Sequence, residues 1–100
     1  MGWASACIEK LKNNETVSFR PRGGSMKGKI ESGQLCTVKP VKEEDLKKGD
    51  IVLCKVNGSE YIHLIKATQG KRFQIGNNLG RINGWIAFNS IYGKLVSVEP

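Results

Sequence analysis

The sequence predicts a mostly β domain that carries one short helix at its N-terminal end. Near the start, within residues 3–11, a series of apolar residues falls at helical spacing. From residue 16 onward, short stretches rich in β-branched and aromatic residues alternate with glycine, asparagine and proline, which is typical of strands joined by turns. A length of 100 residues allows one modest core and no second module. We therefore expect an amphipathic helix over residues 1–14, packed on a β domain over residues 15–100.

The β domain divides into short elements at its turn signals. Met26 and Ile30 are four positions apart, so a single helical turn is expected over residues 25–31. Residues 42–48 form a charged connection, and residues 76–84 form a polar loop with three glycines and three asparagines. Strands are expected over residues 16–20, 34–41, 51–56, 59–68, 72–75, 85–88 and 91–98.

One hairpin is specified in detail. The Asn-Gly pair at residues 57–58 favours a two-residue type I′ turn, because both positions need positive φ. That turn would place Lys55 opposite Glu60, a favourable cross-strand pair, and Val52 opposite His63. Strand alternation then directs His63 to the same face as Tyr61 and to the opposite face from its neighbours on the strand.

Composition limits the function. The chain has 16 Lys and Arg against 9 Asp and Glu, for a net charge of +7. Nucleic acid is therefore open as a partner, but the lysines are scattered and no nucleic-acid-binding motif is present, which favours a solvated surface. Three cysteines and one histidine form neither a disulfide framework nor a zinc pattern, so we expect no metal and no cofactor.

The expected location is the cytoplasm. No apolar run is long enough to span a membrane, and residues 1–7 lack the basic start of a secretory signal. We expect a partner chain to supply any targeting or tethering part.

Ser25 and His63 are the candidate chemical pair. Ser25 follows two glycines, which tolerate backbone dihedrals that other residues avoid, and histidine is the usual base for a serine hydroxyl. By itself, a serine after Gly-Gly is more often a turn residue or a helix cap, and a lone strand histidine is more often structural.

Four stretches, taken together, are similar to the boxes of a known peptidase core. In chain order they are Gly24-Ser25-Met26, then Gly49-Asp50-Ile51-Val52, then Ile62-His63-Leu64-Ile65-Lys66-Ala67, and finally Gly76-Asn77-Asn78 followed by Tyr92-Gly93-Lys94-Leu95-Val96. This order resembles the catalytic core of the LexA/signal-peptidase superfamily. The resemblance implies a coiled antiparallel sheet or partial barrel, with a serine nucleophile at Ser25.

Members of the superfamily use either lysine or histidine as the base, and this chain resembles the histidine variant at His63. Lys66 is the rival, but its spacing from His63 points it to the other face of the strand. Gly23, Gly24 and Met26 are the candidate oxyanion and substrate-binding positions, where backbone N–H groups, Gly24 and Ser25 above all, could stabilise the oxyanion. Asn77 and Asn78 are the candidates for orienting the imidazole.

Two departures from the family pattern bear on activity. Many signal peptidases place a serine two positions before the nucleophile, where this chain has Gly23. The histidine-type enzymes place an aspartate in the closing loop, where this chain has Asn77. Asparagine orients an imidazole but stabilises the imidazolium less than a carboxylate does.

These observations favour a small soluble serine endopeptidase, signal-peptidase-like, that hydrolyses a bond in a peptide or protein substrate with Ser25 and His63. Two alternatives stay open. One is a catalytically degenerate module of the same fold that binds peptides or proteins, and the other is a small basic nucleic-acid or regulatory factor. The substrate and the oligomeric state do not follow from the sequence.

Overall fold

The computed structural model describes residues 3–100 as a seven-stranded sheet with one α-helix. The helix is α1 (Ser5–Lys12). The strands are β1 (Val17–Phe19), β2 (Leu35–Lys39), β3 (Ile51–Val56), β4 (Ser59–Gln69), β5 (Arg72–Gly76), β6 (Ile82–Ala87) and β7 (Ile91–Glu99). Two 3-10 helices, η1 (Glu43–Asp45) and η2 (Phe88–Ser90), lie between β2 and β3 and between β6 and β7.

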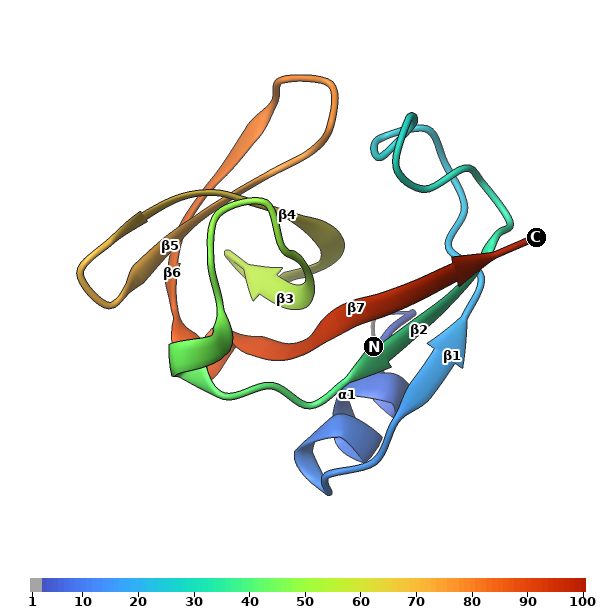
Figure 1. The fold of residues 1–100 in the computed structure, drawn as a ribbon, viewed down its shortest axis with the longest axis horizontal. Helices are drawn as coiled ribbons and strands as arrows, with labels where there is room; N and C mark the ends of the chain where they lie inside the picture. Colours follow the sequence, from blue (N-terminus) through green and yellow to red (C-terminus); the bar gives the residue numbers. More distant parts are fainter. Residues whose placement is uncertain (1–2) are drawn as a thin grey trace.

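The sheet has the strand order β1-β2-β7-β3-β4-β5-β6, and neighbouring strands are antiparallel throughout. It does not close, so β1 and β6 are its two edges. Figure 1 shows the sheet coiling, with the β5–β6 arm on one side and β1, β2 and β7 on the other. The predicted mostly β fold with a coiled antiparallel sheet and one N-terminal helix is confirmed.

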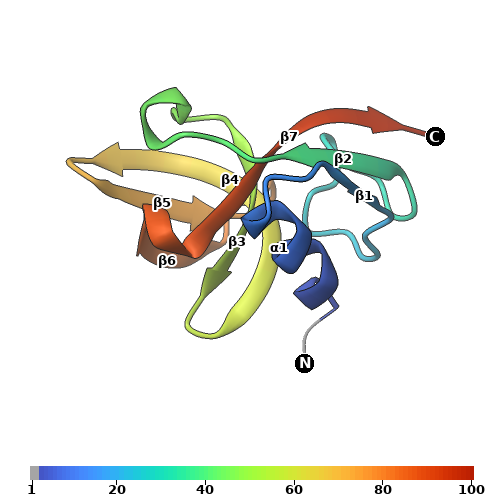
Figure 2. The same cartoon turned by 90° about the horizontal axis from the view of Figure 1, so that it is seen from below.

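The helix α1 covers one face of the sheet beside β1 and β7 (Figure 2). Its buried side chains, Ile8 and Leu11, join a core with Val38 of β2. Leu11 lies over Gly93 of β7, where a Cβ atom would come within 3.0 Å of the leucine and within 2.6 Å of Val38. No helix within residues 3–100 is long and apolar enough to cross a membrane.

The β3–β4 hairpin has the predicted register. Lys55 pairs with Glu60, and Val52 pairs with His63. The turn residues Asn57 and Gly58 have φ values of 50° and 81°, as a type I′ turn requires. Because the side-chain period of a strand is two residues, this register decides which face of the sheet His63 occupies.

The pairings of β5 with β4 and with β6 each contain a bulge that the sequence patterns do not predict. In β4, Ile65 and Ala67 pair with consecutive residues of β5, so Lys66 is the additional residue of a bulge. In β6, Gly84 and Ile82 pair with consecutive residues of β5, so Asn83 is additional there. β6 thus begins at Ile82, inside the segment predicted to be a loop.

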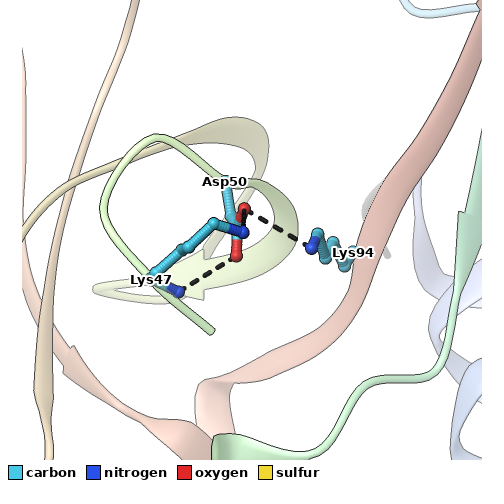
Figure 3. Close-up of polar contacts among 3 residues, drawn as sticks. All are labelled: Lys47, Asp50 and Lys94. Carbon is cyan, nitrogen blue, oxygen red and sulfur yellow. Dashed lines mark hydrogen bonds and ion pairs between the residues drawn. The ribbon is translucent and has the colours of Figure 1, made fainter. Parts of the chain in front are cut away.

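Asp50 ties the start of β3 to two other segments. Its buried carboxylate accepts the backbone N–H of Lys47 at 3.0 Å and the ammonium of the same lysine at 3.2 Å. The ammonium of Lys94, on β7, lies 3.5 Å from the same carboxylate (Figure 3). The Asp50 carbonyl also accepts the N–H of Ile65 at 2.8 Å, which extends the pairing of β3 with β4. The Gly-Asp box is therefore structural in this chain.

Asp50→Ala should lower the free energy of unfolding by about 2 kcal/mol, because it leaves a backbone N–H and Lys94 without their acceptor. Urea unfolding followed by circular dichroism measures the change. The matched control is Lys47→Ala, which keeps the backbone N–H and removes a side chain that is 74% exposed, so its effect should stay within about 1 kcal/mol. Equal effects of the two substitutions would contradict this role of Asp50.

Candidate active site

Ser25 lies on a turn whose neighbouring residues are anchored in the core. The N–H of Lys27 donates to the Gly24 carbonyl at 3.1 Å, and the N–H of Ile30 donates to the Met26 carbonyl at 2.8 Å, which makes one turn of helix. Met26 and Ile30 are buried, at 4% and 3% exposed. Because Met26 is anchored in the core, the backbone at Ser25 is fixed in position while the serine itself is exposed.

The base of this loop is closed by hydrogen bonds across it. The Gly33 N–H donates to the Pro21 carbonyl at 2.8 Å, and the Gly23 N–H donates to the Ser32 hydroxyl at 3.1 Å. Gly23 has a φ of 110°, in the region that favours glycine. Gly23 thus serves the shape of the loop.

The structure brings Ser25 and His63 together. The Ser25 Oγ lies 3.2 Å from the His63 Nε2, which is hydrogen-bond distance. The imidazole is 6% exposed and stacks on the Tyr61 ring, with centroids 4.7 Å apart. The two residues come from a loop and from β4, and the β3–β4 register directs the imidazole toward the serine.

Asn83 holds the other side of the imidazole. Its Oδ1 lies 2.8 Å from the His63 Nδ1. A carbonyl oxygen only accepts, so Nδ1 carries the proton in the neutral ring and Nε2 presents a lone pair. The Ser25 hydroxyl can donate to that lone pair. This is the protonation pattern that a serine nucleophile and its base require.

Burial lowers the pKa of His63 below its ordinary value of 6.5, and the hydrogen bond to Asn83 acts in the opposite direction and raises it. The net direction is downward. The imidazole is therefore neutral at pH 7 and able to accept a proton.

The residue that orients the imidazole is Asn83, and not Asn77 or Asn78 as the sequence predicts. The Asn77 side chain accepts the N–H groups of Leu79 and Arg81 at 2.8 and 2.9 Å, so it shapes its own loop. The Asn78 side chain donates to the backbone of the Ser25 turn. The interpretation of residues 76–84 as a loop hid Asn83, because a bulge in a strand re-aims a side chain in a way that alternation does not predict.

The Lys66 ammonium is not positioned to act as the base for Ser25. Its ammonium donates to the Asn77 carbonyl at 3.0 Å, where it supports the loop after β5. The bulge of β4 gives Lys66 this direction.

The backbone N–H groups near Ser25 differ in availability. That of Gly23 is committed to Ser32. Those of Gly24, Ser25 and Met26 donate to no acceptor within residues 3–100. These three amides are therefore available to an oxygen of a bound molecule, whereas the Met26 side chain belongs to the core.

A cavity of about 410 Å³ opens beside Ser25 and His63. Its walls come from α1's N-terminal side, the loop after β1 and the first half of β4. Apolar side chains and charged groups of both signs line it. The lining residues are Trp3, Arg20, Pro21, Arg22, Gly23, Ser25, Met26, Ile30, Glu31, Ser32, Glu60, Tyr61, Ile62 and His63. Within residues 3–100, no three His, Cys, Asp or Glu side chains gather as a metal site would need.

Comparison with protein families identifies the relationship. The sequence profile of the family described as Peptidase S24-like matches residues 2–78 of the chain. The chain belongs to this Peptidase S24-like family. The match contains Ser25 and His63 and ends before Asn83, so the residue that holds the imidazole lies outside it. A search among curated proteins found no significant match.

The His63 signal should titrate below pH 6.5, and Asn83→Ala should move the midpoint lower still, because it removes the bond that favours the imidazolium. The chain has one histidine, so a single imidazole signal in proton NMR reports it. A midpoint at or above pH 6.5 would contradict the conclusion that burial lowers the pKa of His63.

The same shift predicts how stability depends on pH. His63 binds a proton less readily in the folded protein than in the unfolded chain. Its contribution to the free energy of unfolding is therefore complete above pH 6.5 and is lost as the pH falls through the pKa of His63 in the folded protein. His63→Gln should remove this part of the pH dependence of the free energy of unfolding.

Proposed function

We propose that this protein is a serine peptidase that uses Ser25 as nucleophile and His63 as general base. The observation that carries the proposal is the 3.2 Å approach of Ser25 Oγ to His63 Nε2 at the edge of a cavity. Membership of the Peptidase S24-like family supports it. The family relationship by itself establishes a peptidase-like fold, and the geometry supports the chemistry.

In the acylation step, Ser25 Oγ attacks the carbonyl carbon of the scissile bond while His63 Nε2 takes the hydroxyl proton. The imidazolium then gives that proton to the leaving amine nitrogen, and the carbon–nitrogen bond breaks. Water, deprotonated by His63, attacks the acyl-enzyme and releases the acid and the free serine. In each half of the reaction, Nε2 gains one proton and gives it up again.

Asn83 has the part that an acid has in a Ser-His-Asp triad. Its Oδ1 keeps Nδ1 protonated and the ring in position. A neutral amide stabilises the imidazolium less than a carboxylate does, so we expect slower turnover than in an enzyme with an aspartate at this position.

The available amides of Gly24, Ser25 and Met26 are the candidates for stabilising the oxyanion. Gly23 is also a candidate by its position in the sequence. Its N–H is already bonded to the Ser32 hydroxyl, so of the predicted group Gly24 and Met26 are the better candidates.

An extended peptide can pair with the first half of β4. Backbone groups alternate in direction along an antiparallel ladder, and counting from the turn at residues 57–58 directs those of Glu60 and Ile62 away from β3. β5 pairs with β4 only from Leu64 onward, so within the described chain this edge is unpaired beside the cavity. Strand addition there would lay a scissile bond next to Ser25, with a side chain in the cavity.

A serine-reactive fluorophosphonate should label the protein at Ser25, because the activated hydroxyl displaces fluoride from phosphorus. Ser25→Ala should abolish labelling, and His63→Ala should slow it by on the order of a thousandfold. The control is Ser97→Ala, at an exposed position on β7, which should label at the normal rate. Mass spectrometry of the labelled peptide measures the site. Equal labelling of all four proteins would remove the catalytic proposal.

The peptidase and the peptide-binding module differ in what they do to a mixed peptide library. A peptidase should produce new peptide termini that are absent with Ser25→Ala and with His63→Ala. A binding module should retain peptides, equally with Ser25 or Ala at this position, and produce no new termini. Mass spectrometry of the free and retained peptides distinguishes the two outcomes.

A further inference from the structure

The turn that carries Ser25 is tied to a loop far away in the sequence. The N–H of Asn78 donates to the Ser25 carbonyl at 3.0 Å. The side-chain Nδ2 of Asn78 donates to the Lys27 carbonyl at 2.8 Å. In Figure 1, the loop that joins β5 to β6 and the loop that joins β1 to β2 face each other on the same side of the molecule. Asn78 thus donates hydrogen bonds to the backbone carbonyls of both Ser25 and Lys27.

The segment around Asn78 is itself held in place. The Asn77 side chain accepts two backbone N–H groups of the loop, and its own N–H donates to the Arg81 carbonyl at 2.9 Å. The Asn77 carbonyl accepts the ammonium of Lys66 at 3.0 Å. The carbonyl of the peptide unit that precedes Asn78 is therefore anchored to β4, and Asn77 is anchored to its own loop, so Asn78 follows a residue that is held in place.

Gly28 leaves room for the Asn78 side chain. A Cβ atom at position 28 would lie 3.0 Å from Nδ2 of Asn78, closer than side chains ordinarily approach. The φ of Gly28 is 97°, in the region that favours glycine. A side chain at position 28 would therefore require the Asn78 amide to shift from the position in which it donates to the Lys27 carbonyl.

We infer that Asn78 is a positioning residue that holds the nucleophile turn against His63. The inference rests on the proposed function for its effect on rate, and on the two hydrogen bonds of Asn78 for its effect on the turn. One segment then supports both partners of the reaction. Asn78 holds the backbone of Ser25, and Asn83, five residues later on β6, holds the imidazole of His63.

The first test compares fluorophosphonate labelling rates of the whole protein with those of Asn78→Ala and Asn78→Asp. Both variants lose the donor to Lys27, and the aspartate keeps the shape of the side chain. The rate should fall on the order of tenfold to a hundredfold, because the turn loses its side-chain tie at Lys27 and keeps only the backbone bond at Ser25, so the nucleophile is held less firmly at its attack distance. Asn89→Ala, at an exposed asparagine outside the site, is the matched control and should label normally.

The pH dependence separates positioning from a general loss of structure. The midpoint of the labelling rate against pH should stay at the normal value in Asn78→Ala, because burial and Asn83 determine the pKa of His63, whereas the carboxylate of Asn78→Asp should move the midpoint higher. In Asn83→Ala that midpoint should move lower. A normal labelling rate in both Asn78 variants would overturn the inference, and so would a midpoint that moves as it does in Asn83→Ala.

Hydrogen exchange tests the same inference without catalysis. In the Asn78 variants, the hydrogen-bonded amides of Lys27 and Ile30 should exchange faster, while those of the β3–β4 hairpin should be unchanged. If the unaltered protein is not labelled at all, the proposed function fails and exchange alone decides. Faster exchange confined to the turn then supports the tie by Asn78, and unchanged exchange overturns it.

Discussion

The register of the β3–β4 hairpin is the constraint on which the site depends. A two-residue turn at Asn57 and Gly58, both with positive φ, places His63 opposite Val52. A shift by one residue would exchange the two faces of β4 and move the imidazole away from Ser25. The central position of β3, paired with β4 on one side and β7 on the other, makes such a shift costly, and the ion pairs of Asp50 hold its first end.

Around this regular hairpin, the chemistry of the site comes from irregular positions. Ser25 stands on a loop turn, and Asn83 is the extra residue of a bulge on β6. A second bulge turns Lys66 toward the Asn77 carbonyl, where it supports the loop that reaches the serine. Bulges near an edge re-aim single side chains without changing the pairing of the rest of the strand. The regular part of the sheet thus provides a rigid support, and the bulges and the loop turn provide the side-chain contacts of the site.

Features that depend on interactions between residues close in sequence are predictable from the sequence, and features that depend on distant residues are not. The helix, the seven strands and the hairpin register follow from spacing and from one Asn-Gly pair, which act over a few residues. Ser25 and His63 were candidates by residue type and by resemblance. Asn77 and Asn78 were assigned to the imidazole, and the structure places Asn83 there, because the start of β6 lacks the alternation that would mark it as a strand.

The sequence by itself determined the mostly β fold and the face of β4 on which the histidine lies. Both depend on local dihedral preferences and on a two-residue side-chain period. Only the tertiary structure decided which asparagine holds the imidazole and which holds the serine turn. Those contacts join residues 20 and 51 positions apart, and they exist because the coiled sheet brings β6 to His63 and the loop before β6 to the Ser25 turn. No local preference encodes that approach.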